Sequence, residues 1–332
     1  MDKEYKSISA SRIKTLQNCS WMYWCNYILK LPDTPNEGAM KGTVCHLIFE
    51  LLLNKKHKNH YNKVVKKNHI EGSEAVNRLV IKHMKKFGIY RDSEYDMVNN
   101  MILVGLNHNF YSKGVKLFDP EYEFNIVNEE PRYNIAGFID KWGLDKKNKE
   151  IHIYDYKSSK QKFTGDDFDS NIQAMLYSLV AKKTHPEYVP IVTFIFLRYG
   201  ADPEQVVKYE NQTLEGFEHY LEKINEIINN FSYSDAKSNL ANNKPQKGKG
   251  FNGRLLCGRA KEKGQLKKDG TLMWHCAFKF PYDYFVLLDE KGKQVKSAFS
   301  ISDFGAIKQG YTIDKREYAG CPAHNKTSLT NF

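Results

Sequence analysis

Apolar residues recur at helical spacing through the first third of the chain. Residues 9–31 carry them three and four positions apart, and Pro32 and Pro35 end the predicted helix. A turn around NEGAMKG leads into a second helix, TVCHLIFELLL, which is apolar on most sides and is therefore expected to be buried. Residues 55–70 are basic and rich in His, and the pattern over 74–113 predicts two further helices.

The spacing changes to that of strands after residue 120. YEFNIVNE, YNIAGFIDKWGL and EIHIYDYKSS predict three consecutive strands, with DKKNKE as the hairpin turn between the last two. A helix (DDFDSNIQAMLYSLVAKKT), two strands (VPIVTFIFLRYG and QVVKYEN) and a long helix (TLEGFEHYLEKINEIINNF) follow. This order predicts an α/β core with a central mixed sheet of about five strands flanked by helices.

These patterns divide the chain into four segments. We expect N-terminal helices in 1–56, a helical insertion covering the core in 57–118, the sheet-containing core in 119–232, and a basic loop with a tail containing Cys and His in 233–332. The stretch 233–271 is polar and rich in Lys, Gly and Asn, which predicts a mobile loop.

The charge balance narrows the class of partner. The chain contains 50 Lys and Arg against 39 Asp and Glu, a net charge of +11. A polyanion such as nucleic acid is the leading explanation, because basic surfaces release the counterions of phosphates; a basic surface kept for solubility and a Lys/Asn-rich genome are the alternatives. With no apolar run long enough to span a membrane and no signal-peptide core, we expect a soluble, cytoplasmic protein.

The first candidate for chemistry is the segment GFIDKWGLDKKNKEIHIYDYKSS. Asp155 and Lys157 lie two positions apart on a strand and so face the same side, and the hairpin brings Asp140 of the preceding strand near them. Two close carboxylates suit Mg²⁺ or Mn²⁺, and the Lys157 ammonium would help to generate hydroxide and offset charge at a scissile phosphate. A solvated acidic–basic pair is the alternative, but charges within apolar strands favour a functional site.

Two helices supply further candidates. His46 and Glu50 lie four residues apart on one helix face, and a neutral imidazole can complete the coordination of a metal ion. Gln173 and Tyr177 have the same spacing on a later helix. Each pair also has a structural interpretation, as a core histidine and as the polar edge of an amphipathic helix.

Taken in order over about residues 9–230, these elements resemble the RecB-type branch of the PD-(D/E)XK nuclease superfamily, which includes the CRISPR-adaptation exonucleases and the nuclease domains of bacterial double-strand-break repair machines. SASRIKTLQNCSWMYW is similar to the opening helix of that branch. The other matches are GTVCH (42–46) to G-x-x-x-H, GFID (137–140) to G-x-x-D, DYK (155–157) to D/E-x-K, and QAMLY (173–177) to Q-x-x-x-Y.

The resemblance implies a restriction-endonuclease-like core and a metal-dependent deoxyribonuclease. It implies metal binding by His46, Asp140 and Asp155. Lys157 would then be the catalytic lysine, and Gln173 and Tyr177 would orient the lysine, the substrate or the DNA. It favours an exonuclease acting on DNA ends or single-stranded flaps, in recombination, repair or phage DNA processing, in a bacterial or phage-infected cytoplasm. Recombination proteins or a second copy of the chain are the expected protein partners.

The six cysteines leave three alternatives open. Many members of the branch hold an iron–sulfur cluster with one early and three closely spaced late cysteines. Cys19 stands in the early position, but Cys257, Cys276 and Cys321 are widely spaced. An iron–sulfur cluster on these four residues, a zinc site on the last three with His324, and unliganded thiols are the alternatives. Cys45, in an apolar helix, is expected to be a small buried residue.

Two rival functions remain. One is a catalytically silent DNA-binding or end-protecting module of the same fold, against which the intact acidic residues and lysine argue. The other is a nucleic-acid-binding protein centred on a metal cluster or zinc. Basic stretches interleaved with aromatics, as in KKHKNHYNKVVKK, NKPQKGKGFNGR and WHCAFKFPYDYF, suit a DNA channel, and we expect the 233–271 loop to clamp the DNA.

Overall fold

The computed structural model describes residues 6–33, 36–241, 256–268 and 270–325. The chain forms two compact units, the first from Met1–Ala10 and Pro35–Glu226 and the second from Ser11–Thr34 and Ile227–Phe332. The early helices therefore belong with the C-terminal region. The four segments predicted from the sequence do not coincide with these two units, and that division stays a prediction.

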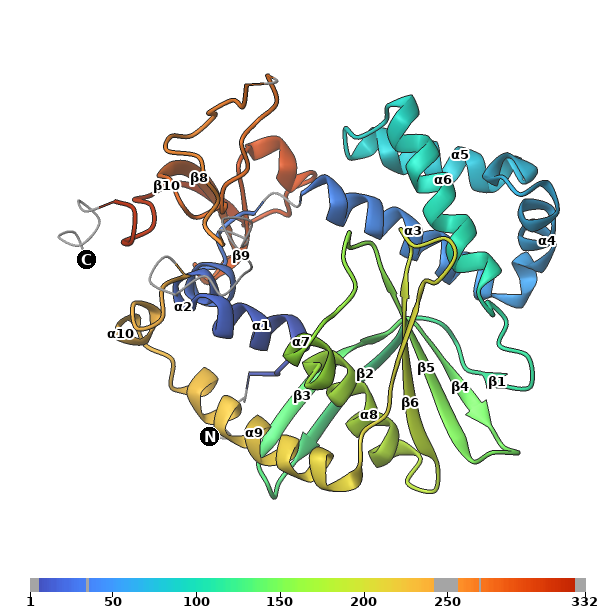
Figure 1. The fold of residues 1–332 in the computed structure, drawn as a ribbon. Coiled ribbons are helices and arrows are strands. Elements are labelled where there is room, and N and C mark those ends of the chain that lie inside the picture. Colours follow the sequence, from blue (N-terminus) through green and yellow to red (C-terminus); the bar gives the residue numbers. More distant parts are fainter. Residues whose placement is uncertain (1–5, 34–35, 242–255, 269, 326–332) are drawn as a thin grey trace. The chain divides into compact units, whose positions relative to one another are not determined.

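A five-stranded mixed sheet is the framework of the first unit (Figure 1). Its order is β1-β4-β5-β6-β7, formed by Lys116–Leu117, Lys141–Asp145, Glu150–Lys157, Val189–Phe196 and Glu204–Val207. Strands β5 and β6 are parallel, and the other neighbouring pairs are antiparallel. The hairpin of β4 and β5 and the mixed α/β core are as the sequence predicts.

A separate two-stranded ribbon lies between β1 and β4 along the chain. It consists of β2 (Tyr122–Asn128) and β3 (Tyr133–Ile139). The prediction of one continuous strand over YNIAGFIDKWGL is wrong, because Ile139 still pairs with β2 whereas Lys141 already pairs with β5. The chain changes sheets at Asp140.

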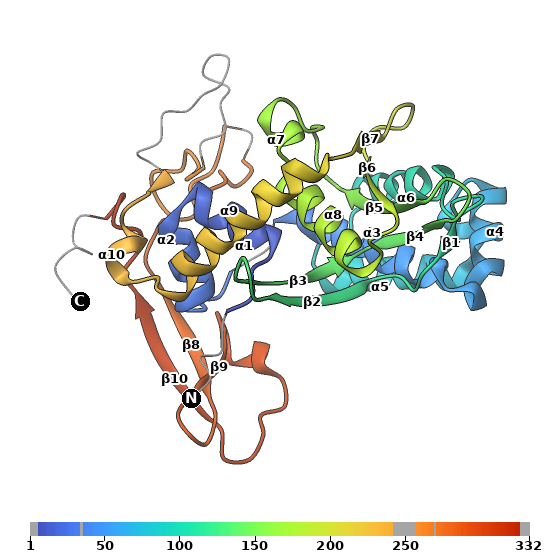
Figure 2. The same ribbon diagram turned by 90° about the horizontal axis from the view of Figure 1, so that it is seen from below.

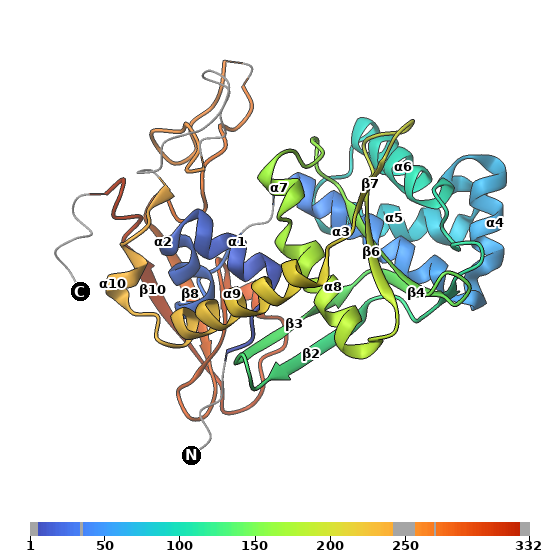
Figure 3. The same ribbon diagram turned by 60° about the horizontal axis from the view of Figure 1, so that its bottom comes forward.

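Helices cover the two faces of the five-stranded sheet (Figure 3). On one face lie α3 (Glu37–Leu53), α4 (Lys58–Lys67), α5 (Glu74–Lys86) and α6 (Asp92–Asn107), with two short 3₁₀ turns at Lys55–His57 and Ile70–Gly72. Their apolar side chains share one core with Tyr154 and Tyr156 of β5. Most of the predicted insertion thus packs as helices against the sheet.

The opposite face carries α8 (Ile172–Thr184), which packs on β6 (Figure 2). The predicted helix over 166–184 is divided into α7 (Asp166–Asp169) and α8, because Asn171 is extended and caps α8 by accepting hydrogen bonds from the Gln173 and Ala174 amides. The long helix α9 (Asn211–Asn229) follows β7.

The second unit contains a sheet that the sequence patterns did not predict. Strands β8 (Tyr282–Leu288), β9 (Gln294–Ala298) and β10 (Thr312–Tyr318) are antiparallel in the order β10-β8-β9. They share a core with the early helices, in which Trp21 and Cys25 meet Phe278 and Tyr318. A short helix α10 (Tyr233–Ala236) and a 3₁₀ turn (Ile301–Phe304) complete the unit.

The predicted single helix over 9–31 is also wrong. The structure has α1 (Ala10–Asn18), α2 (Ser20–Tyr23) and a π-helical turn (Trp24–Ile28). The interruption is at Cys19, whose extended backbone (φ −163°, ψ 113°) breaks the helical path. Across the described residues, every helix is too short or too polar to cross a bilayer.

Candidate active site

Two carboxylates meet where the β2–β3 ribbon ends. The register of the ribbon pairs Tyr122 with Ile139, so the preceding Glu121 lies opposite Asp140. The Glu121 amide donates to the Asp140 carbonyl at 3.1 Å, and Glu121 adopts a left-handed φ of 52°. The Asp140 carboxylate also accepts a hydrogen bond from the Tyr156 amide at 2.9 Å, which ties it to β5.

His46 approaches the carboxylates from α3. A Cβ at Gly42, one turn earlier, would lie 2.8 Å from the Ser158 hydroxyl, so a residue without a side chain lets the helix pass close to the end of β5. The His46 Nε2–H donates to the Tyr156 carbonyl at 3.0 Å. In the neutral ring, Nδ1 then carries the free lone pair, and this nitrogen faces the two carboxylates.

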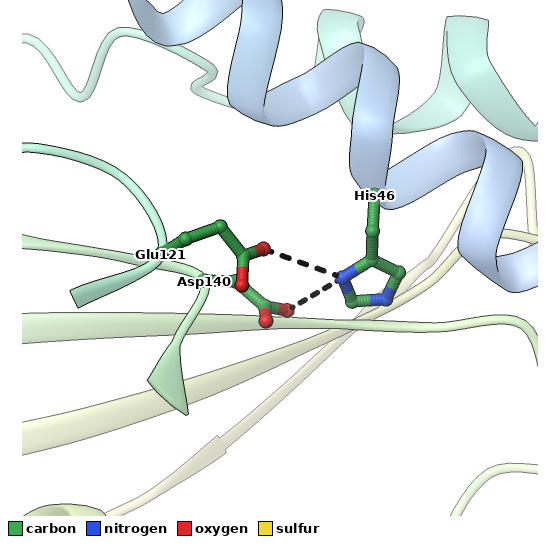
Figure 4. Close-up of side chains that lie close together, drawn as sticks. All are labelled: His46, Glu121 and Asp140. Carbon is green, nitrogen blue, oxygen red and sulfur yellow. Dashed lines mark ion pairs between the residues drawn. The ribbon is translucent and has the colours of Figure 1, made fainter. Parts of the chain in front are cut away.

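His46, Glu121 and Asp140 form a set that could hold a metal ion. Figure 4 shows both carboxylates pointing toward the imidazole. Nδ1 of His46 lies 3.4 Å from Asp140 Oδ2 and 4.0 Å from Glu121 Oε1, and one ligand atom from each residue lies within 4.8 Å of the others. Two hard oxygens and an imidazole nitrogen fit a divalent ion such as Mg²⁺ or Mn²⁺.

The pKa shifts of His46 and Glu121 also indicate a site for a cation. Burial would lower the pKa of His46, but the carboxylates, chiefly Asp140, raise it to about 9. Burial raises the pKa of Glu121, and the neighbouring Asp140 raises it further. A cation between these groups would remove that mutual repulsion.

Asp155 and Lys157 form a second cluster with α8. Lys157 Nζ lies 2.5 Å from Asp155 Oδ2 and donates to Gln173 Oε1 at 2.6 Å. The Gln173 amide nitrogen donates to Asp155 Oδ1 at 2.8 Å, and the Tyr177 hydroxyl donates to the same oxygen at 3.1 Å. The four side chains therefore hold one another in a fixed arrangement.

The Asp155 carboxyl is only 2% exposed, so its environment decides its charge. Burial raises its pKa, the Lys157 ammonium opposes that effect, and the charge of Asp140 adds to it. The Asp140 carboxylate thus links the two clusters electrostatically. Removal of Lys157 would leave a buried carboxylate without its cation, which is costly.

The structure brings the predicted residues of the first unit together, but it divides them between two clusters of side chains. Asp155 contacts Lys157 and α8 rather than His46, while Glu121, which the sequence interpretation missed, takes the third place beside His46 and Asp140. The antiparallel register of β2 and β3 is the signal that would have found Glu121. Glu50 is exposed and adds to the electrostatic field that raises the Glu121 pKa.

The four predicted cysteines meet in the second unit. Cys19, Cys257, Cys276 and Cys321 line one pocket, together with His324. Burial raises the pKa of Cys276 to about 11 and that of Cys321 to about 12. Cys45 is fully buried, as expected, in the core of the first unit. Part of the predicted clamp, residues 242–255, lies outside the described residues.

A family model described as the PD-(D/E)XK nuclease superfamily matches residues 7–244. No curated protein sequence matches the chain. Among solved structures, the chain is similar to the Eubacterium rectale protein named "Putative exonuclease", with 11% identity, a TM-score of 0.44, and coverage of 68% of this chain and 81% of that one. It is also similar to protein VC1899 from Vibrio cholerae, with 10% identity, a TM-score of 0.22, and coverage of 70% and 58%.

Proposed function

Because the chain belongs to the PD-(D/E)XK nuclease superfamily, we propose that it is a Mg²⁺- or Mn²⁺-dependent deoxyribonuclease whose site is formed by His46, Asp140, Asp155 and Lys157. The observation that supports this most directly is the meeting of an imidazole and two carboxylates beside a buried Asp–Lys pair. Glu121 joins the proposed metal ligands. Gln173 and Tyr177 are positioning residues, since they act through Asp155 and Lys157.

Each side chain of the site has its own role in the proposed phosphodiester hydrolysis. A bound divalent ion stabilises negative charge on the phosphate and lowers the pKa of water. His46 presents Nδ1 to the ligand set because its other nitrogen is engaged by the Tyr156 carbonyl. The Lys157 side chain is 22% exposed, so its ammonium can reach a phosphate and offset the charge that develops in the transition state. Gln173 limits the rotamers of that lysine.

We further propose that the enzyme is an exonuclease that degrades linear DNA from its ends, in recombination, repair or phage DNA processing. The order of the motifs supports this, through the resemblance to the RecB-type branch. The net charge of +11 suits DNA as the substrate.

The deciding experiment is digestion of end-labelled linear DNA and of circular DNA with Mg²⁺ or Mn²⁺. We expect wild-type protein to degrade the linear DNA and spare the circle, and Lys157→Ala and Asp155→Ala to lose the activity. Lys82→Ala, at an exposed position on α5, is the matched control and should cut normally. Circular dichroism must show that all four proteins are folded.

Two results would overturn the proposal. Cleavage that survives both substitutions would place the catalytic site elsewhere. Metal-independent binding of DNA without cleavage, unchanged in both variants, would instead support a catalytically silent DNA-binding or end-protecting module.

We also propose a metal centre on Cys19, Cys257, Cys276 and Cys321. All four line one pocket, and thiolates are the ligands of both iron–sulfur clusters and zinc. Tetrahedral zinc would draw its sulfurs to about 3.8 Å from one another. Among the described residues, the donor sets gathered within 4.8 Å include none of these cysteines. His324, which lines the same pocket, would complete the zinc alternative.

Metal analysis of the purified protein, with an absorbance scan near 400 nm, tests this second proposal. Iron with absorbance supports a cluster, and zinc without absorbance supports the alternative site. Protein that binds neither metal after anaerobic reconstitution would leave the cysteines as unliganded thiols.

A further inference from the structure

The chain between Cys257 and Cys276 forms a hairpin of its own. Leu266 and Leu272 pair across it, the Lys267 amide donates to the Thr271 carbonyl at 2.7 Å, and the Met273 amide donates to the Gln265 carbonyl at 2.8 Å. We call residues 258–275 the lysine hairpin. Residue 269 is outside the described residues and is not part of the surface considered below.

The base of the lysine hairpin is firmly closed. Gly258 pairs with His275, and the Cys276 amide donates to the Cys257 carbonyl at 3.2 Å. A Cβ at Gly258 would lie 2.3 Å from the Trp274 carbonyl oxygen, so only glycine permits this approach. The buried Lys279 ammonium donates to the Gly258 and Ala260 carbonyls at 3.1 and 2.6 Å. The hairpin therefore starts from a rigid base beside the thiol pocket.

One face of the hairpin is apolar and exposed. Leu266 is 56% exposed, Leu272 opposite it is 68% exposed, and Trp274 is 54% exposed. Leu272 and Trp274 are two positions apart on the same arm of the hairpin. Three exposed large apolar side chains on one hairpin, one of them an indole, indicate a surface that binds a ligand.

The charges around this face specify the partner. Lys261, Lys263, Lys267 and Lys268 are exposed. The sequence from 259 to 269 holds five basic residues, including Arg259, and only two acidic ones. An apolar protein partner would gain nothing from this excess, whereas a polyanion with flat apolar faces would match both features.

We propose that the lysine hairpin binds single-stranded DNA, with a base stacked on Trp274 and the lysines against neighbouring phosphates. In a duplex the base faces are covered by their neighbours, so only a single strand offers both groups to this surface. The inference rests on the proposed function, because it takes DNA as the substrate. It assigns strand recognition to the second unit, apart from the proposed cleavage chemistry.

The test is a titration of the full-length protein with an oligothymidylate, without added Mg²⁺ or Mn²⁺ so that the ion needed for cleavage is withheld, followed by tryptophan emission. Of the other three tryptophans, Trp21 and Trp142 are 3% and 2% exposed and Trp24 is half-buried, so the part of the quenching that Trp274→Ala removes reports on Trp274. We expect Trp274→Ala to weaken binding about tenfold and Trp274→Phe to retain most of the affinity, because a phenyl ring still stacks.

The phosphate contacts have their own measurement. Lys267→Ser with Lys268→Ser should lower the slope of log K against log salt by about 1.4, since each contact with a single strand contributes about 0.7. Lys291→Ser with Lys293→Ser is the matched control, because these two lysines are exposed at the β8–β9 turn of the same unit. It should leave both the slope and the affinity unchanged.

Three outcomes would overturn the inference: Trp274→Ala binding as tightly as wild type, equal affinity for duplex DNA without quenching, or Trp274-dependent self-association in place of DNA binding. The nuclease proposal fails separately. If wild type never cuts DNA with metal yet binds oligothymidylate through Trp274, the hairpin inference stands alone; if it cuts and Trp274→Ala binds normally, only the nuclease proposal survives.

Discussion

The oxygen-rich site of the first unit and the thiol pocket of the second are both clusters of side chains that can bind metal ions, but they are assembled differently. Asp140, Asp155 and Lys157 come from one stretch of consecutive strands, where register alone brings them close. Cys19 and Cys321 come from opposite ends of the sequence and meet only through packing of the second unit. Residues that meet through pairing of consecutive strands form a motif that can be recognised in the sequence. Residues that meet through packing of distant segments can be recognised only by their type.

Substitutions that affect one site at a time give the strongest test of whether the two sites are independent. Asp140→Asn should lower DNA cleavage by more than 100-fold, because substitutions of groups that only support metal ligands already cost 10–100-fold. It should leave the iron or zinc content of the protein unchanged. Cys276→Ser should lower that content and leave Mn²⁺ binding at the first site intact, as measured by titration of the metal-free protein.

Reciprocal effects would contradict the assignment of two independent sites. If Cys276→Ser abolished Mn²⁺ binding while circular dichroism remained native, the two clusters would have to be coupled. Cys45→Ser serves as the control for loss of a thiol outside the pocket, and it should leave the metal content of the second unit unchanged.

The next effect concerns pH at the oxygen-rich site. The pKa of His46 is raised to about 9 in the metal-free protein, from about 6.5 when unfolded. The charged imidazole therefore adds stability that is complete below pH 6.5 and lost as the pH rises through 9. A metal must displace this proton, so Mn²⁺ affinity should rise about tenfold per pH unit between 7 and 9.

Isothermal titration with Mn²⁺ across that range measures the effect. His46→Gln should bind more weakly and lose most of the pH dependence, because an amide carries no competing proton. A wild-type affinity that does not change from pH 7 to 9 would exclude His46 as a ligand.

Each unit also contains a buried lysine, and we expect the two lysines to affect stability differently. Burial lowers the pKa of Lys141, which is 2% exposed, to about 7; its ammonium donates to the Asn109 carbonyl at 2.8 Å and lies 3.8 Å from the centre of the Tyr154 ring. The unfolded chain therefore binds more protons between pH 7 and 10, and stability should rise with pH across that window. Lys141→Met should raise the free energy of unfolding at pH 7 by roughly 1–3 kcal/mol, with a gain that shrinks toward pH 10.

Lys279 should behave in the opposite way. It donates to two backbone carbonyls at the base of the lysine hairpin, and Lys279→Met would leave both without their donor. We expect a loss of about 2 kcal/mol or more in unfolding by urea. If both methionine variants shifted stability in the same direction, the distinction between a buried lysine with one carbonyl acceptor and one with two would be wrong.

The smallest effect is expected at Glu121. Glu121→Gln keeps an oxygen ligand but loses its charge, so Mn²⁺ affinity should fall by about tenfold or less. Glu150→Gln is the matched control, because Asp145, Glu150 and His152 form another group with ligand atoms within 4.8 Å at the far end of the β4–β5 hairpin. An equal loss in both variants would show that Glu121 acts only through net charge.

Sequence reasoning reached part of this arrangement. The alternation of β5 and the helical spacing of α8 predicted that Asp155 and Lys157 share a face and that Gln173 and Tyr177 share another, and the structure joins the two pairs by hydrogen bonds. Such periodicities are local, so a single sequence reveals them.

The features that sequence reasoning missed depend mainly on pairing between separate segments of the chain. The change of sheet at Asp140 follows from β2 competing with β5 for neighbouring residues, and Glu121 enters only through that same register. The break at Cys19 was missed because apolar spacing continues across it, although the residue is extended. The β8–β10 sheet was missed because its strand β10, TIDKREY, is mostly exposed and lacks clear alternation.

The assembly of the second unit from both ends of the chain has a consequence for biosynthesis. Residues 11–34 emerge from the ribosome early, but Phe278, Tyr282 and Tyr318, which bury Trp21 and Cys25, are translated about 250 residues later. At about 5–20 residues per second, the early segment waits roughly 10–50 s with its apolar side chains uncovered. During that interval the first unit has time to fold before the second can close.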